Sequence, residues 1–404
     1  MVLKKRVVVT GIGIITAHGI GKEANWSKVR SGTACIGEIS SFDSLKYRGK
    51  HGGEAKEFRA APLRLLEVKR LDRASLLLIG AAREALSDAG LDSGINAAVL
   101  LSVGTTLGGM LSGEAFHKEV IAKGLDRGRL SLVADYLAHN QAINLFKEFR
   151  LRGDFNVFSN ACASGTNAIG HAFNSIRGGN YEIALCGGYD TMSEFTFAGF
   201  NALMAITPEL CRPFDNNRSG LVLGEGSGIL VLEELGHAIK RNARILGEVA
   251  GYGESSDAHH MTSPEPSGAN AASAVTSAVL DAGGPVVDYI NAHGTGTRYN
   301  DTMEAKALVI AFGKRAGGIP VSSIKPMIGH LLGGAGAVEA IISLLSIIHK
   351  TLPPNINYEV PDPGCDLNVV TEAAQHPIKT VLSNSFGFGG SNAALVLKEY
   401  EWGG

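Results

Sequence analysis

Short apolar runs rich in valine and isoleucine alternate along this chain with longer segments whose apolar positions recur every three or four residues. The first pattern is typical of buried β-strands and the second of helices with one buried face. The expected strands are 6–10, 97–103, 156–159, 183–187, 228–233, 243–252, 289–291, 321–323, 380–383 and 393–398. The expected helices are 68–89, 140–149, 166–177, 268–281, 301–312 and 335–349. Such alternation favours an α/β protein in which helices cover mixed sheets.

Parts of this pattern occur twice. "NVFSNACASGTNAIGHAFNSI" and "PVSSIKPMIGHLLGGAGAVEAIISLL" each contain a strand ending in serine, a short loop with reactive residue types and a helix rich in glycine and alanine. "VLLSVGTTLGG" and "YINAHGTGT" also share a plan, and the two pairs follow the same order in each half. The sequence therefore predicts an internal duplication, with an N-terminal half over 1–250 and a C-terminal half over 251–404.

The composition narrows the class of protein. The chain has 404 residues, 45% of them hydrophobic, and a net charge of −2, which gives no electrostatic basis for binding nucleic acid or a membrane surface. Its five cysteines are dispersed without a CxxC pair, which is typical of reduced thiols in a cytoplasmic protein. The apolar helix 335–348 contains Glu339 and is too short to span a bilayer, so we expect a soluble protein without membrane insertion.

The N-terminal run "VVVTGIGIIT" could also be read as part of a signal peptide or as a dinucleotide-binding loop. Its β-branched residues followed by turn residues favour a first core strand over a signal peptide. Gly11 and Gly13 resemble part of a dinucleotide-binding loop, but Thr16 occupies the third glycine position. No acidic residue ends a second strand where a ribose would bind, so we expect no organic cofactor.

Cys162 lies in "NACASGTNAI", between an expected buried strand and a helix that opens with small residues. One interpretation is a small buried thiol that fills space in the core. The other is a nucleophile at a helix N-terminus, where the helix dipole and free N–H groups favour the thiolate. This segment alone leaves both interpretations open.

Three further reactive side chains follow expected strands. His293 precedes a loop of glycine and threonine, and Lys325 and His330 lie in "VSSIKPMIGHLLGG". Asp301 and Glu304 share one face at a helix start, where acidic residues also stabilise the helix dipole. Because ligands bind at the ends of strands in α/β sheets, we expect Cys162 and these side chains to form one site.

The late segment "NSFGFGGSNA" alternates Phe386 and Phe388 with glycines between two expected strands. A glycine-rich hairpin would explain it structurally. A hinged aromatic gate would explain it functionally, because glycine permits large backbone changes and phenylalanine can close an apolar tunnel.

Taken together, these motifs resemble the β-ketoacyl-(acyl carrier protein) synthases that elongate chains by decarboxylation, and the resemblance covers nearly the whole chain. It is carried by "ACASG", "NAHGTGT", "SIKPMIGHLLGGAGAVE", "RPFDNNRSGLVLGEG" and "NSFGFGGSN". The resemblance implies the thiolase fold, in which two duplicated α/β halves form five αβαβα layers, and it implies a homodimer. It also implies an acyl carrier protein as partner, loaded with acyl or malonyl groups, and requires no metal or cofactor.

The resemblance assigns a role to each reactive residue. Cys162 takes the acyl chain as a thioester, and His293 and His330 act on the malonyl group. Lys325 is tied to the site by Asp301 and Glu304. The backbone N–H groups of Cys162 and Phe388 form an oxyanion hole. The expected substrate contacts are Thr295, Thr297, Leu107, Phe200, Ala161 and Phe386.

Related enzymes differ at identifiable positions. Starter-type synthases and chalcone-type enzymes use Cys–His–Asn, and thiolases carry a second cysteine near the C-terminus, whereas this chain has His330 and a late loop without cysteine. The alternative is a non-catalytic chain-length partner subunit of a polyketide synthase heterodimer, which lacks the nucleophile.

The chain departs from the fatty-acid pattern at Met204, where fatty-acid synthases usually carry arginine, so the carrier and the pathway stay open. The basic residues expected to contact an acidic carrier protein are Lys69, Arg70, Arg73, Arg127 and Arg129.

Overall fold

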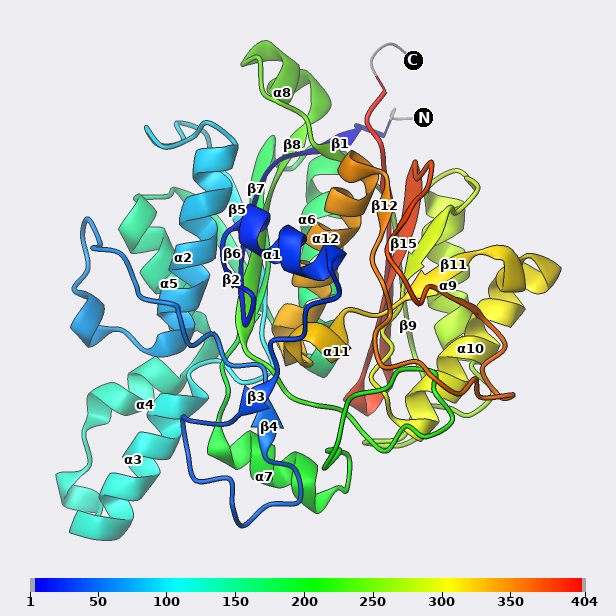
Figure 1. Ribbon diagram of the computed structural model, residues 1–404. Coiled ribbons are helices and arrows are strands. Elements are labelled where there is room, and N and C mark those ends of the chain that lie inside the picture. The colour runs from blue at the N-terminus through cyan, green and yellow to red at the C-terminus, as the bar shows by residue number, and fades with distance from the viewer. Residues whose placement is uncertain (1–3, 402–404) are drawn as a thin grey trace.

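A computed structural model describes residues 4–401 as a long mixed sheet covered by helices on both faces (Figure 1). The strand order is β13-β11-β10-β15-β16-β9-β1-β8-β7-β5-β6, and β2 (Gly19–Ile20) pairs with β1 beside this path. Two short antiparallel pairs lie outside this sheet, β3 (Gly37–Glu38) with β4 (His51–Gly52) and β12 (Thr351–Leu352) with β14 (Ala374–Gln375). Within the sheet, the other strands of the first half are β1 (Val7–Thr16), β5 (Val99–Gly104), β6 (Gly153–Phe158), β7 (Ile183–Asp190) and β8 (Gly226–Glu234). Those of the second half are β9 (Gly247–Ser256), β10 (Tyr289–Asn291), β11 (Pro320–Ser322), β13 (Asn368–Val369), β15 (Thr380–Gly387) and β16 (Ser391–Lys398).

Two sets of five strands have the same order and the same orientations. β6-β5-β7-β8-β1 corresponds to β11-β10-β15-β16-β9, with the first two pairings parallel and the last two antiparallel in each set. The sets meet where β1 pairs briefly with β9, from Val7 opposite Val249 to Val9 opposite Gly247. By strand order, the second set therefore begins at β9, which contains residue 250.

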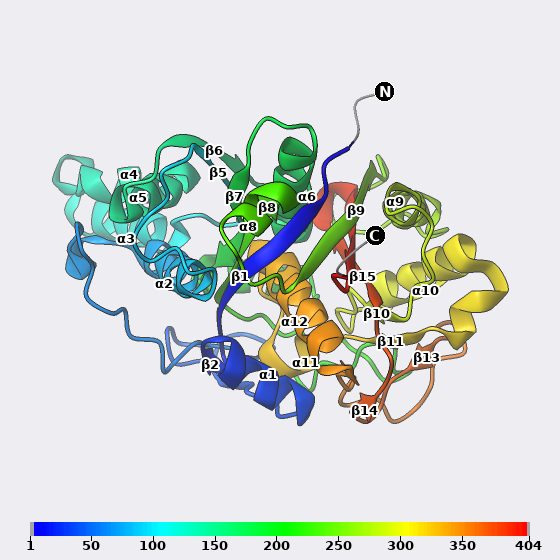
Figure 2. The same ribbon diagram turned by 90° about the horizontal axis from the view of Figure 1, so that it is seen from above.

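The helices form three layers around these strands. The longer ones are α1 (Lys22–Arg30), α2 (Arg73–Asp88), α3 (Met110–Lys123), α5 (Ala138–Phe149), α6 (Ser164–Arg177), α7 (Glu194–Ala202), α9 (Ala269–Asp281), α10 (Arg298–Phe312) and α12 (Ala335–His349). The shorter ones are α4 (Leu130–Tyr136), α8 (Leu235–Lys240) and α11 (Lys325–Ile328). Helices α6 and α12 lie between the two sets of strands, with α2 and α5 outside one set and α9 and α10 outside the other (Figure 2). The expected five-layered αβαβα arrangement is confirmed.

The central position of α12 explains its composition. Strands from both halves pack on this helix, so apolar side chains are required on every face. The 18-residue segment Leu332–His349 has the length and hydropathy of a membrane span, but 89% of it is buried within the protein. Glu339 is accommodated in this apolar layer by an ion pair with Lys325.

Three expectations about local structure were wrong. The segment at Gly11 and Gly13 is not a turn, because β1 continues to Thr16. A Cβ at these glycines would lie 2.2 Å from Ala85 O and 2.0 Å from Ala81 O, so glycine is required for the close approach of α2. Strand β6 is largely exposed, since it lies at the edge of the sheet. The sequence pattern also failed to predict α3 and α4, whose apolar residues are mostly not buried.

Candidate functional site

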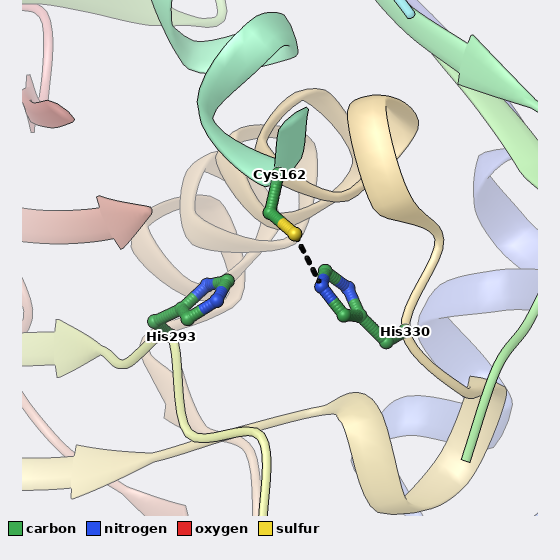
Figure 3. Close-up of side chains that lie close together, drawn as sticks. All are labelled: Cys162, His293 and His330. Atoms are coloured by element: carbon green, nitrogen blue, oxygen red, sulfur yellow. Dashed lines mark hydrogen bonds between the residues drawn. The ribbon is translucent and has the colours of Figure 1, made fainter. Parts of the chain in front are cut away.

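Cys162 lies in a tight turn between β6 and α6. The turn is a single 3-10 segment, Ala161–Ala163, and Ala161 has a φ of 56°, a left-handed conformation that is rare outside glycine. Ser164 stabilises the turn, since its Oγ accepts a hydrogen bond from Asn160 N at 2.9 Å and donates one to Ala161 O at 2.6 Å. This geometry points the thiol away from the helix and into the site (Figure 3).

Two imidazole rings face this thiol from the other half of the chain. His293 follows β10, and His330 follows α11 (Figure 3). His330 Nε2 lies 2.9 Å from Cys162 Sγ, and the two rings meet edge-on with centroids 5.3 Å apart. Cys162, His293 and His330 therefore lie together, as expected.

Burial controls the protonation of all three groups. It raises the pKa of the Cys162 thiol to about 12, although Lys325 and the backbone N–H of Phe388 act in the opposite direction. Burial, with Lys325 nearby, lowers the pKa of both His293 and His330 well below the ordinary value. At neutral pH the resting site therefore holds a thiol and two neutral imidazoles. The helix N-terminus does not by itself produce the thiolate suggested by the sequence.

Lys325 fixes the orientation of His293. Its Nζ donates to the Glu339 carboxylate and to His293 O, and it lies 3.4 Å from His293 Nδ1. Because an ammonium can only donate, Nδ1 of His293 is the acceptor and Nε2 carries the ring proton. This N–H is then available to a substrate oxygen.

The expected tie from Lys325 to Asp301 and Glu304 was wrong. Both carboxylates are used by the backbone at the start of α10: Glu304 accepts from His293 N and Gly294 N at 2.8 Å each, and Asp301 accepts from Thr295 N at 3.1 Å. They face the loop that precedes their own helix, which leaves Glu339 of α12 as the partner of Lys325. Burial raises the pKa of Glu304 to about 7. These two residues therefore support the His293 loop.

A cavity of about 270 Å³ opens onto the three reactive side chains. Thr295, Thr297, Phe200, Phe386 and Phe388 all line it, as expected. The rings of Phe200 and Phe388 stack with centroids 5.4 Å apart, and Phe386 packs edge-on against His293. The phenylalanines thus form an apolar wall of the cavity that contains the thiol.

Leu107 and Ala161 do not line this cavity. Leu107 packs instead in an apolar cluster that also contains Phe200, behind the wall.

Backbone N–H groups also face the thiol. The backbone N–H of Phe388 acts to lower the pKa of the Cys162 thiol, in opposition to burial. A Cβ added to Gly387 would lie 3.2 Å from Cys162 N, so the gate loop packs directly against the nucleophile's own amide. The loop of Gly387 and Phe388 therefore lies directly beside the nucleophile.

The same cluster is the candidate for metal binding in the described chain. One ligand atom each of Cys162, His293 and His330 lies within 4.8 Å of the others. Sulfur and imidazole nitrogen are donors that Zn²⁺ accepts, and three protein ligands leave a fourth position open.

The predicted carrier-binding residues have different environments. Lys69 and Arg70 are exposed and adjoin Glu67, Arg127 is exposed, and Arg129 pairs with Glu119 on the surface. The expectation that Arg73 belongs to a free basic surface was wrong. Its guanidinium donates to the buried Glu225 carboxylate at 2.6 Å and to Ala55 O at 3.0 Å. These two contacts occupy the charge within the protein itself.

Sequence reasoning missed the roles of two buried carboxylates near the site, Glu339 and Asp190. Glu339 had a detectable signal, because it is the acidic residue in an otherwise apolar helix. Asp190 had no such signal, because it lies at the end of a strand with an ordinary sequence pattern.

Comparisons with known proteins identify the family of this chain. Residues 4–238 match the N-terminal domain of β-ketoacyl synthases, and residues 246–359 match the C-terminal domain. A 3-oxoacyl-[acyl-carrier-protein] synthase 2 of Synechocystis is 40% identical over 415 residues, spanning 98% of this chain and 99% of the relative. The enzyme of the same name from Staphylococcus aureus is 39% identical over 409 residues, with the same coverage.

Solved structures extend the likeness to the whole fold. The ishigamide ketosynthase/chain length factor matches with a TM-score of 0.95 and 36% identity, covering 98% of this chain and 100% of that one. A ketosynthase in complex with its type II polyketide acyl-carrier protein and bound to the hexaketide matches with a TM-score of 0.91 and 30% identity over the same shares. From its motifs, its five layers and these matches, the chain belongs to the β-ketoacyl synthase family.

Proposed function

We propose that this protein is an acyltransferase that joins an acyl group held on Cys162 to malonyl-acyl carrier protein, with loss of carbon dioxide, to give β-ketoacyl-acyl carrier protein. The observation that carries the proposal is the Cys162–His330 contact of 2.9 Å, with His293 edge-on to His330. The relatives named 3-oxoacyl-[acyl-carrier-protein] synthase 2 support the same reaction class.

In the first step the Cys162 sulfur attacks the carbonyl carbon of an acyl-carrier thioester. Because the pKa of the thiol is raised, its proton has to leave during the attack, and His330 Nε2 is positioned to accept it. The carrier sulfur departs and takes up that proton. The result is an acyl-Cys162 thioester and a free carrier thiol.

In the second step the malonyl group loses its carboxylate as carbon dioxide, and the electron pair of the broken C–C bond becomes an enolate on the thioester. Once Cys162 is acylated, its sulfur no longer donates to His330 Nε2, so the neutral ring can carry its proton on that nitrogen. The Nε2–H groups of His293 and His330 then stabilise the enolate oxygen. Lys325 supports this role because it keeps the ring proton of His293 on Nε2. Phe386, Phe388 and Phe200 keep bulk water from the carbanion.

In the third step the enolate carbon attacks the acyl carbonyl on Cys162. The tetrahedral oxyanion is held by the N–H groups of Cys162 and Phe388. The attack forms the new C–C bond, and collapse of the tetrahedral intermediate breaks the C–S bond to Cys162. This gives the β-ketoacyl product and a cysteine thiolate, which takes up a proton. Overall one proton is consumed and one carbon dioxide is released per condensation.

The non-catalytic chain-length subunit is the alternative function. The arrangement of Cys162, His293 and His330 in one buried cavity argues against it, because a subunit without chemistry has no need for this geometry. The two halves of the chain have different tasks in our proposal. The half over 1–250 supplies the nucleophile, and the half over 251–404 supplies both histidines, Lys325 and the gate.

Acyl carrier protein is the proposed partner. A neighbour's structure pairs a ketosynthase with its acyl-carrier protein, which supports this choice. We place an acidic carrier near Lys69, Arg70, Arg127 and Arg129, which are exposed, and leave out Arg73. Met204 lies exposed at the cavity, so this part of the carrier contact is apolar.

We further propose a cytoplasmic homodimer in which β6 pairs with β6 of a second copy. Support comes from the exposed edge of β6, where Phe155 is 37% accessible, and from the apolar residues exposed on α3 and α4, including Ile121 and Leu130. Pairing the edges would satisfy the free backbone groups of β6 and cover these side chains.

The proposed function is tested by incubating the protein with malonyl-acyl carrier protein and acyl-carrier proteins of graded chain length, and weighing the products by mass spectrometry. We expect products longer by two carbons and carrying a β-ketone. Absence of elongation at every length, with correctly loaded carriers, would contradict the proposal.

Leu107→Phe is expected to shorten the preferred acyl chain without reducing malonyl decarboxylation. Each CH₂ that fits an apolar tunnel gains roughly 0.8 kcal/mol, whereas overpacking costs about 1–3 kcal/mol. A larger side chain in the cluster behind Phe200 should therefore exclude the longest substrates. Elongation rates across acyl lengths test this, with Leu86→Phe as a control in a separate apolar cluster. An unchanged length profile would mean that the acyl chain runs elsewhere.

A further inference from the structure

Asp190 ends β7 close to the site and has a carboxylate completely shielded from solvent. Its Oδ1 accepts hydrogen bonds from Thr105 Oγ1 at 2.7 Å and Leu107 N at 2.9 Å. Its Oδ2 accepts from Thr106 N at 2.8 Å and Gly333 N at 2.7 Å. All four donors are neutral, so hydroxyl and backbone dipoles hold this buried group in place.

The segments joined by Asp190 have different tasks in the proposed reaction. Thr105–Leu107 follows β5 and carries the side chain that we place at the acyl tunnel. Gly333 belongs to the 3-10 segment Leu332–Gly334, which directly continues the loop of His330. One carboxylate therefore links the Thr105–Leu107 segment to the loop that carries His330.

The His330 loop has a backbone that needs such support. Leu332 has a φ of 53°, a left-handed conformation that is unfavourable for a branched side chain and persists only where surrounding contacts enforce it. A Cβ on Gly333 would lie 2.5 Å from Thr106 N, so this loop is pressed against the Thr105–Leu107 segment. The hydrogen bond from Gly333 N to Asp190 fixes the loop at this contact.

We propose that Asp190 is a positioning residue for the condensation, which holds the His330 loop and the Leu107 segment in a fixed relation without touching substrate. The inference rests on the proposed function and deepens it. It means that the rate of decarboxylation and the preference for acyl length depend on the same buried carboxylate.

Asp190→Asn tests this inference. The amide has nearly the same shape, but its NH₂ cannot accept from the two donors that face one of the carboxylate oxygens. We expect kcat for malonyl decarboxylation to fall about 10–100-fold, as for lost supporting contacts at other active sites, while KM for malonyl-acyl carrier protein stays within about twofold. We also expect the acyl-length profile to broaden.

Glu148→Gln is the matched control. Glu148 is a buried carboxylate on α5 that accepts from Arg64 N at 2.7 Å and Leu65 N at 3.1 Å, outside the active-site cavity. We expect this variant to lose thermal stability without changing the decarboxylation rate or the length profile. If it changed both as strongly as Asp190→Asn does, general destabilisation would explain the data and the inference would be overturned.

Thr105 provides a second test that does not depend on the folding of the Asp190 variant. Thr105→Val removes one of the four donors and should cause the same two effects at smaller size, whereas Thr105→Ser keeps the hydroxyl and should restore both. If the wild-type protein decarboxylates malonyl-acyl carrier protein and Asp190→Asn and Thr105→Val do so at the same rate and with the same length profile, this inference alone is overturned. Wild-type protein without decarboxylation or elongation would overturn the proposed function and the inference with it.

Discussion

Cys162→Ala is expected to form no acyl-enzyme and to lower the elongation rate by roughly 10⁴-fold or more, since the covalent step loses its nucleophile. The structure supplies no substitute, because the other four cysteines lie outside the active-site cavity. The sulfur also lies where the His330 ring and the Phe388 N–H converge. An alanine side chain is smaller and uncharged, so the fold should be retained.

The measurement is mass spectrometry of the intact protein and of its peptides after incubation with acyl-acyl carrier protein. The matched control is Cys186→Ala, which removes a thiol equally buried on β7. Burial raises the pKa of that thiol as well, but no histidine contacts it. The control should acquire the acyl mass on the Cys162 peptide. Acyl groups on Cys35, Cys211 or Cys365 of the wild-type protein would refute the assignment.

Removing either imidazole is expected to lower malonyl decarboxylation by about 10²- to 10³-fold, or about 3–4 kcal/mol in the barrier, the usual effect of losing one preorganised donor to a developing oxyanion. The two variants should differ in acyl transfer. His330 Nε2 contacts the sulfur and His293 does not, so His330→Ala should also acylate slowly. His293→Ala should acylate within about threefold of wild type.

Release of labelled carbon dioxide from malonyl-acyl carrier protein and the rate of acylation of Cys162 measure the two steps separately. His349→Ala is the matched control, because this histidine also packs against a ring, that of Trp26 at 5.1 Å, but lies at the far end of α12. It should leave both steps intact. Equal loss of both steps in His293→Ala would show that the division of tasks between the rings is wrong.

The chemistry of the site could be predicted from the sequence because it depends on residue types at strand ends. Cys162 and His293 follow the recognisable strands β6 and β10, and His330 follows β11 after the short helix α11. The parallel strand ends of each half place these loops on the same side of the sheet. The alternation of strands and helices likewise predicted helices that cover a mixed sheet, and the resemblance to the synthases implied the five layers. The duplication could be predicted because each half contains the same strand and loop motifs in the same order.

The partners of the buried charges could not be predicted in this way. Lys325 pairs with Glu339 on α12, not with Asp301 or Glu304, because the central packing of α12 decides which carboxylate reaches the ammonium. Asp190 shows the same limit, since its four donors come from segments that only the fold brings together.

Besides the partners of the charged groups, only the tertiary structure decided which residues are buried. The local pattern of Cys162 left open a buried thiol or a thiolate at a helix N-terminus, and burial between both halves raises the pKa of the thiol to about 12. The sequence predicted turn residues at Gly11 and Gly13, but the packing of α2 against β1 is what requires glycine there. It also predicted a buried strand at β6, which lies at the edge of the sheet. The sequence by itself predicted which side chains form the candidate site and where the chain alternates between strand and helix. Strand order and helix packing determined which charges meet and what is hidden from water, because these depend on distances between segments far apart in the chain.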